Sequence, residues 1–333
     1  MTPAVVRAVQ LDTLFPFVDN VASPPGPAEW DAYLSHHGRS FWMAARMIPQ
    51  PHRSELAGVY AYCRYTDDLV DHATCPPEDV LRMLDQWESL SRQAYAGKHT
   101  GVELLDVVIG GMHTHDVPFE YVEGLMRGMR SDVVGARFET MADLKDYCHD
   151  VASVVGLWLT ELFGVHDRWT LDRASRLGVA MQLTNIARDV GEDWERGRMY
   201  LPQGMLRAHG VTDQMIGQLR HGNSPIPASY AALMEELMTA AEAEYALAAD
   251  AIVNLPAFFR SSVAVAARVY AGIHDAIRAN EYDSIRRRAS TSNEQKMSLA
   301  RAAIAALAGL DARPARERTA TRNHSSPAQS LHV

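Results

Sequence analysis

The chain has 333 residues with a formal net charge of −9 at pH 7, and this acidic balance disfavours a nucleic-acid-binding protein, which usually carries a basic excess. A hydrophobic fraction of 47% and a charged fraction of 22% exclude a disordered or fibrous chain. The three cysteines lack CxxC spacing, which argues against a disulfide framework and a structural zinc site. No run of residues approaches the roughly 18 apolar positions of a membrane-spanning helix. We therefore expect a cytoplasmic protein that contacts the inner face of the membrane at most peripherally.

The elements predicted along the chain are helices. Residues 1–27 are expected to be irregular, because the prolines and the glycine at 24–27 break helices. From residue 28 on, apolar residues mostly recur at helical spacing, whereas strand signals are nearly absent. The prediction is an all-α, single-domain multi-helix bundle over 28–311, followed by a disordered tail over 312–333. The segments expected to be helical are 55–73, 81–96, 143–163, 171–193, 229–253 and 256–280.

Two pairs of aspartates stand in unfavourable places. Asp67 and Asp71 lie four residues apart in one predicted helix, and Asp189 and Asp193 do so in another. Asp is a poor helix-interior residue, and like charges one turn apart repel by roughly 0.2–0.5 kcal/mol. Local stability does not explain this pattern. Mg²⁺ does, because it prefers oxygen ligands and is usually held by one or two carboxylates together with substrate phosphates. Two such pairs facing each other across a bundle would bind a diphosphate.

Each pair belongs to a polar stripe on its helix. Tyr60 and Arg64 lie on the same helix face as the first pair, and Gln182 and Asn185 on the same face as the second. Polar side chains that face inward need partners, which bound metal, phosphate and water would supply. Further contacts to an anion are expected from residues close to the second pair: Arg188, Arg198 and Tyr200.

Two other interpretations of these side chains remain open. Either pair can belong to a solvated acidic face with ordinary ion pairs. A histidine-based metal site, as in all-α metal phosphohydrolases, is the other interpretation, because dipeptides of His followed by Asp occur in the chain. Examples are His115-Asp116, His149-Asp150 and His274-Asp275.

Both aspartate motifs resemble those of the squalene/phytoene synthase family, the head-to-head prenyl synthases. The motifs read YAYCRYTDDLVDH at 60–72 and QLTNIARDVGEDWERGRMYLP at 182–202. The second is especially similar to that of the bacterial phytoene synthases in this family. The resemblance covers about 35–296, and its other matching segments are 36–49, 128–133, 147–156, 255–260 and 269–290.

This resemblance implies an isoprenoid-synthase-type bundle with a deep central cavity. It implies that Mg²⁺ or Mn²⁺ is bound by Asp67, Asp71, Asn185, Asp189 and Asp193. Catalytic roles are implied for the four aspartates together with Tyr60 and Arg64. Substrate contacts are implied for a wider set of residues: His37, Arg39, Ser40, Phe41, Asp132, Gln182, Asn185, Arg188, Arg198, Tyr270 and Arg287.

The activity that the resemblance implies is the 1′–1 condensation of two prenyl diphosphates into a cyclopropylcarbinyl diphosphate, which then ionises, rearranges and loses a proton. Geranylgeranyl diphosphate is the expected substrate and phytoene the expected product. Ala45 and Ala57 stand where C30-forming relatives tend to carry bulky aromatics, and small residues there would leave room for a longer chain, so Ala57→Trp is expected to shorten the accepted substrate. Ordinary helix-packing alanines are the other interpretation of these two positions. A C30 synthase that uses farnesyl diphosphate and a non-catalytic scaffold are the alternatives. No NADPH is expected, and a downstream desaturase is the expected partner.

Overall fold

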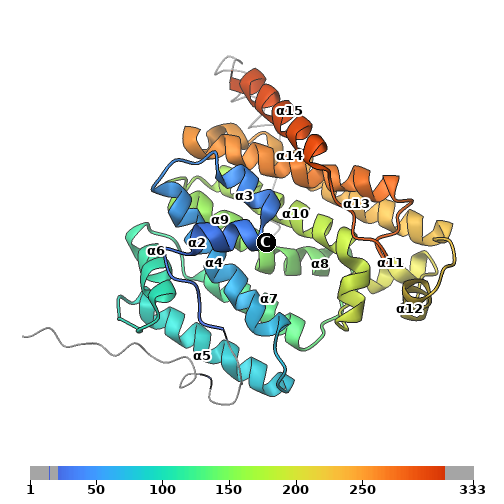
Figure 1. Ribbon diagram of the computed structural model, residues 1–333, viewed down its shortest axis with the longest axis horizontal. Coiled ribbons are helices and arrows are strands. Elements are labelled where there is room, and N and C mark those ends of the chain that lie inside the picture. The colour runs from blue at the N-terminus through green and yellow to red at the C-terminus, as the bar shows by residue number, and fades with distance from the viewer. Residues whose placement is uncertain (1–14, 16–21, 312–333) are drawn as a thin grey trace, which may run out of the picture.

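The computed structural model describes Phe15 and residues 22–311, in which α-helices are connected by short loops and turns (Figure 1). No strand occurs in this part of the chain, which confirms the all-α prediction. The predicted irregular segment 1–27 falls largely outside the described residues, and the predicted tail 312–333 falls wholly outside them. Within 22–311, no helix has the length and apolar character that crossing a membrane requires.

The helices are, in chain order, α2 (Trp30–His37), α3 (Arg39–Ala45), α4 (His52–Asp71), α5 (Pro77–Tyr95), α6 (Gly110–Thr114), α7 (Glu120–Val133), α8 (Met141–Cys148), α9 (Val154–Leu162), α10 (Arg168–Glu195), α11 (Gln203–Ala208), α12 (Asp213–His221), α13 (Ala228–Ala249), α14 (Ala257–Ala279) and α15 (Asn293–Asp311). Three shorter elements join them: the π-helical turns η1 (Leu105–Ile109) and η2 (His149–Ser153), and the 3-10 turn η3 (Ile252–Asn254).

Most of the helices pack in two groups, while α15 packs with α3 and α14 in a smaller cluster. One apolar core surrounds α4 with α2, α5, α7 and α9, and a second surrounds α10 with α8, α11, α12, α13 and α14. Phe41 on α3 and Val151 in η2 pack against both cores, so the two groups meet at these side chains. The two helices that carry the aspartate pairs, α4 and α10, are therefore each central to one group.

The predicted segment 143–163 is one helical run with an irregular turn in its middle. α8, η2 and α9 follow each other without a break, and η2 is a π-helical turn. α10 approaches this turn closely at Gly178, where a Cβ atom would lie 2.4 Å from the Cα of Ser153. Such bulges often occur at functional sites, and this one brings Val151 and Ala152 into the wall of a cavity.

The predicted helix 229–253 ends earlier than expected, at Ala249. The chain turns at η3, where Asn254 Nδ2 donates a hydrogen bond to Thr170 Oγ1 on α10 at 2.9 Å. Farther back on α13, Glu244 Oε2 is 3.1 Å from Arg176 Nη1. The C-terminal end of α13 thus lies beside the N-terminal end of α10, and the two helices run antiparallel.

Candidate active site

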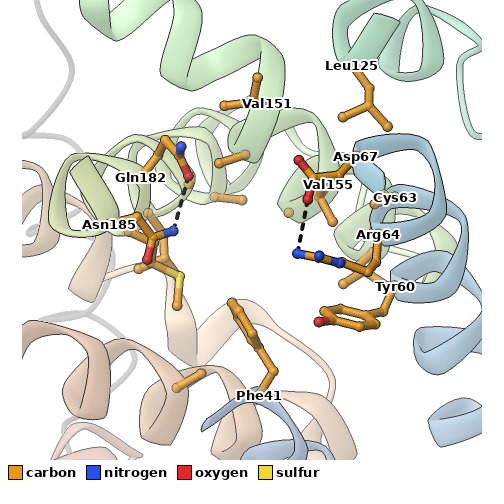
Figure 2. Close-up of a pocket in the computed structure, with 18 of the residues that line it drawn as sticks. Phe41, Tyr60, Cys63, Arg64, Asp67, Leu125, Val151, Val155, Gln182 and Asn185 are labelled. Atoms are coloured by element: carbon orange, nitrogen blue, oxygen red, sulfur yellow. Dashed lines mark hydrogen bonds and ion pairs between the residues drawn. The ribbon is translucent and has the colours of Figure 1, made fainter. Parts of the chain in front are cut away.

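A cavity of about 740 Å³ lies between the two helix groups, a size typical of ligand pockets. Its wall includes residues of α3, α4, α7, α9, α10 and α14. Figure 2 shows Tyr60, Arg64 and Asp67 on one side of the cavity, with Gln182 and Asn185 on the side opposite. The two polar stripes predicted from the sequence therefore face each other across one space.

Helix α10 lines this cavity along almost its whole length. Its lining residues recur every three or four positions from Thr170 to Asp193, so one continuous helix face borders the cavity. The face is charged toward its C-terminal end, over 188–193, and mainly small and apolar over 174–181. The cavity therefore has a polar end and an apolar end.

The first aspartate pair lies on α4 at the polar end. Arg64 Nη1 is 3.0 Å from Asp67 Oδ2 (Figure 2). Asp71 Oδ1 accepts a hydrogen bond from Arg198 Nη1 at 2.7 Å, and Arg196 Nη1 lies 3.4 Å from the other oxygen. Because Arg196 and Arg198 directly follow α10, these ion pairs connect the first motif to the second.

The second pair lies on α10 across the cavity. Asp189 accepts hydrogen bonds from Arg188 and from Arg288, whose Nε is 2.8 Å from Asp189 Oδ1. The main-chain carbonyl of Asp193 accepts a hydrogen bond from the backbone N–H of Arg198 at 2.8 Å. The turn that ends α10 therefore directs Arg198 back toward α4.

The four carboxyl groups differ in their electrostatics. Burial and the neighbouring Asp71 raise the pKa of Asp67 to about 7, although Arg64 opposes the shift. Burial and the neighbouring Asp189 raise the pKa of Asp193 to about 8. Burial acts on Asp189 too, but Arg188 and Arg288 outweigh it and hold its pKa below the usual value. One carboxyl on each helix is therefore short of positive charge.

The donor atoms at the polar end fit a hard divalent cation. All are oxygens, and two of the carboxyls have raised pKa values of the kind that a nearby cation would lower. Asn185 Oδ1 is buried with no hydrogen-bond partner, while its amide nitrogen donates to Gln182 Oε1 at 3.2 Å (Figure 2). Within the described residues no three acidic, His or Cys side chains form a ready-made metal cluster. Oxygens of a bound diphosphate would therefore have to complete the coordination.

Asp132 connects α7 to both neighbouring walls of the cavity. Its carboxylate accepts hydrogen bonds from the hydroxyl of Tyr147 at 3.0 Å and from that of Tyr200 at 2.7 Å. Burial raises the pKa of Asp132, with Arg198 acting in the opposite direction. The network holds Tyr200 and Asp132 in fixed positions beside the aspartate pairs.

Most of the residues predicted to form the site do line this cavity. Besides the four aspartates they are His37, Phe41, Tyr60, Arg64, Asp132, Gln182, Asn185, Arg188 and Arg198. Tyr270 lies one layer behind: its ring is buried 5.0 Å from that of Phe41, beside the guanidinium of Arg188.

Comparison with known proteins agrees with this arrangement. The squalene/phytoene synthase family model matches residues 34–295. The chain belongs to this family. A phytoene synthase of Thermus thermophilus is 36% identical over 264 residues, covering 78% of this chain and 87% of the relative. A 15-cis-phytoene synthase of Paracoccus sp. is 34% identical, covering 80% and 86%.

A solved dehydrosqualene synthase in complex with ligand superimposes with a TM-score of 0.72 at 27% identity, covering 85% of this chain and 96% of that structure. The predicted isoprenoid-synthase-type fold is therefore confirmed. As a member of the squalene/phytoene synthase family the chain is a prenyltransferase, and enzymes of this family bind diphosphate through a divalent metal ion.

Besides Tyr270, three family positions predicted to contact substrate do not line the cavity. Arg39 is exposed at the start of α3, and neither it nor Ser40 lines the wall. Arg287 is likewise exposed and does not line the wall, whereas Arg288 lines the wall and binds Asp189. In this family member, Arg288 is thus the arginine of the 286–288 run that reaches the site.

A close backbone contact explains why Arg288 reaches the site. Gly191, between the two aspartates of α10, touches the segment after α14, and a Cβ there would lie 1.8 Å from the carbonyl oxygen of Ile285. The Gly191 N–H donates to the Ser284 carbonyl at 3.1 Å. Three residues past this anchor, Arg288 lies beside Asp189. The sequence offered one signal, a glycine inside the aspartate motif.

The two alanines predicted to leave room for the prenyl chain have different positions. Ala45 lines the cavity, whereas Ala57 is fully buried in the core around α4 and does not line it. At residue 57 the structure therefore favours the other interpretation, an alanine that packs within the helix core. A bulky side chain at 57 would strain the core instead.

The histidine-based alternative finds no support in the geometry. His115 and Asp116 are exposed, and Asp150 forms an ion pair with Arg127 at 2.7 Å. His274 is buried, and its two ring nitrogens lie within hydrogen-bond distance of Thr184 and Glu242, away from the cavity. These dipeptides serve separate structural contacts.

Proposed function

We propose that this enzyme condenses two molecules of geranylgeranyl diphosphate head to head into phytoene, by way of prephytoene diphosphate. The observation that carries the proposal is one cavity with aspartate pairs from α4 and α10 at its polar end and apolar side chains along the rest. Relatives named phytoene synthase, 34–36% identical over 78–80% of the chain, support the choice of product. Diphosphate would bind at the polar end, and the prenyl chains would lie along the apolar wall.

Mg²⁺, or Mn²⁺ in its place, would be held by the two aspartate pairs, with Asn185 Oδ1 as a further oxygen ligand. When bound, the metal ion supplies Lewis-acid stabilisation to the departing diphosphate. The remaining work falls to this chain's own residues. Arg198 and Arg288 place fixed positive charge beside Asp71 and Asp189, where a leaving diphosphate would gain charge-assisted hydrogen bonds.

The apolar part of the wall would protect the allylic cation until it meets the second prenyl chain. Leu125, Val155 and Leu159 line the cavity between the polar end and its far side, and such a wall excludes water. Each half of the reaction releases one diphosphate and one proton. Because proton loss ends the sequence, no NADPH is required by the proposal.

The product is a C40 hydrocarbon that partitions into lipid. We propose that the enzyme releases it at the inner face of the membrane, where a desaturase would act on it next. This part of the proposal rests on the chemistry of the product alone.

The experiment supplies purified protein with geranylgeranyl diphosphate and Mg²⁺, without NADPH, and analyses the organic extract by chromatography and mass spectrometry. The expected result is a C40 hydrocarbon with a central triene and release of diphosphate, both abolished by a chelator. Turnover of farnesyl diphosphate without a C40 product would replace the proposal with a C30 synthase. Inertness toward both substrates would support a non-catalytic scaffold and overturn the proposal.

A further inference from the structure

A charged residue lines the apolar part of the cavity. Arg173 lines the cavity on α10 and is only 2% exposed. Its guanidinium forms an ion pair with Asp172 and lies over the ring of Trp169, 5.2 Å from the ring centre. A buried arginine in the wall of an otherwise hydrocarbon-like space is unusual, because arginine is rarely buried to this extent.

Three other elements also contribute wall residues to the cavity. Thr160 lies on α9, Ala248 lies on α13, and Ile252 begins η3, with Ala251 directly before it. The antiparallel contacts of α13 with α10, Glu244 with Arg176 and Asn254 with Thr170, bring this part of α13 beside Arg173. We call these the end-wall residues: Thr160, Thr170, Arg173, Ala248, Ala251 and Ile252.

The end wall lies at a defined distance from the carboxylates. Arg173 and Asp189 stand 16 residues apart on α10, one uninterrupted helix that lines the cavity between them. At 1.5 Å per residue this separation is about 24 Å. C–C bonds of about 1.5 Å in a zigzag advance roughly 1.25 Å per carbon, so the 16-carbon main chain of a geranylgeranyl group spans about 19 Å. The remaining length accommodates the diphosphate.

Chains one isoprenoid unit longer or shorter do not match this length. On the same scale, the main chain of a C15 farnesyl group spans about 14 Å and that of a C25 geranylfarnesyl group about 24 Å. The longer chain would press on the guanidinium of Arg173, which cannot give up its polar contacts to hydrocarbon without a large cost. Asp172 and Trp169 hold the guanidinium in place, so the Arg173 side chain moves aside less easily than an aliphatic side chain would.

We propose that Arg173 is a specificity-determining residue that forms the end of the prenyl-chain site and limits the substrate to C20. This inference rests on the proposed function, since it assumes that prenyl chains occupy the apolar part of the cavity. It assigns a chain-length role to a residue more than four helical turns from the carboxylates.

The test measures kcat/KM for all-trans C15, C20 and C25 prenyl diphosphates, each supplied as sole substrate, with products identified by mass spectrometry. Arg173→Ala should raise the ratio of C25 to C20 turnover about tenfold or more, the range expected for opening an apolar pocket. Arg173→Met keeps the length of the side chain but loses the contacts with Asp172 and Trp169, so it should give a ratio between those of the wild type and Arg173→Ala.

Arg168→Ala is the matched control. Arg168 is the first residue of the same helix, is exposed, and does not line the cavity. Its loss should leave the chain-length ratio unchanged. Ala251→Leu fills the end wall from the opposite side and should favour C15 over C20, which keeps the inference testable if Arg173→Ala does not fold.

Failure of the inference and failure of the proposed function give different results. If the wild type forms no C40 product, the proposed function is wrong whatever the Arg173 variants do. If the wild type forms it, but Arg173→Ala and Ala251→Leu fold and retain the wild-type ratio, the end wall does not set the chain length. An equal shift in Arg168→Ala would also overturn the inference, because it would show a general loosening of α10.

Discussion

The two aspartate pairs occupy equivalent places on α4 and α10, but their charges are neutralised in opposite order. On α10 the first member, Asp189, is held by two arginines, and the second, Asp193, has a pKa of about 8. On α4 the second member, Asp71, is ion-paired with two arginines, and the first, Asp67, has a pKa of about 7. Each helix thus presents one neutralised carboxylate and one that lacks sufficient positive charge.

This difference indicates that the two aspartates of each pair have different contacts and different roles. The neutralised members, Asp71 and Asp189, hold arginines that come from other parts of the chain, Arg198 and Arg288. The others, Asp67 and Asp193, line the cavity and have raised pKa values, because too little positive charge lies near them. A bound cation would supply that charge. In the proposed function both pairs would hold the metal ion, and Asp71 and Asp189 would in addition position anion-binding arginines.

The largest expected effect comes from removing one carboxylate from either helix. Asp67→Ala and Asp189→Ala should each reduce turnover at least about 10³-fold, because charge stabilisation at the leaving diphosphate is lost. The measurement is C40 product formation, with circular dichroism to establish that the helical fold is intact. Glu195→Ala, on α10 but outside the cavity wall, is the control and should retain activity. Activity retained in both aspartate variants would contradict a metal-binding role for the pairs.

A smaller effect is expected from removing the arginine that neutralises Asp189. Arg288→Met deletes a charge-assisted contact, and the loss of such a bond at about 1.5–3 kcal/mol corresponds to a roughly 10- to 100-fold lower kcat/KM. Arg287→Met is the matched variant one residue away, and its side chain is exposed outside the wall. We expect it to remain within a few-fold of the wild type. If steady-state kinetics show a larger loss of kcat/KM for Arg287→Met than for Arg288→Met, Arg287 is the arginine that contacts the substrate.

Much of this site could be predicted from the sequence because its main part is local. Four-residue spacing on a helix places Asp67 with Asp71 and Asp189 with Asp193 whatever the surrounding fold. The stripe through Gln182 and Asn185 follows from the same periodicity and is confirmed along α10. The all-α architecture followed equally directly, since apolar residues recur at helical spacing over most of the chain.

The rest of the site depends on contacts between distant segments. Whether Arg287 or Arg288 reaches Asp189 is decided in a non-helical segment by its backbone contact with Gly191, so no periodicity indicates the register. Whether Ala57 borders the cavity depends on the rotation of α4 within its core. The end wall at Arg173 arises from the meeting of α9, α10 and α13, and no local pattern marks it.

The smallest expected effect concerns the stability of the metal-free enzyme. The folded-state pKa values of Asp67 and Asp193, about 7 and 8, lie above the ordinary value of 3.8. Between about pH 4 and pH 8 these carboxyls therefore bind more protons in the folded than in the unfolded state, and the free energy of unfolding falls as the pH rises through this window. In the presence of a chelator, we expect the melting temperature to fall by a few degrees between pH 5.5 and pH 8.

The double variant Asp67→Asn/Asp193→Asn isolates this contribution. Two histidines, His37 and His274, have lowered pKa values and act in the opposite direction, because the unfolded state then binds more protons. Comparing the variant with the wild type across the same pH series cancels them, since both proteins contain them. The variant should be more stable than the wild type at pH 8, and the gap should close toward pH 5.5. Adding Mg²⁺ and inorganic diphosphate should stabilise only the wild type at pH 8. If the difference in stability between the variant and the wild type does not vary with pH, the pKa values of Asp67 and Asp193 are not raised in the folded state.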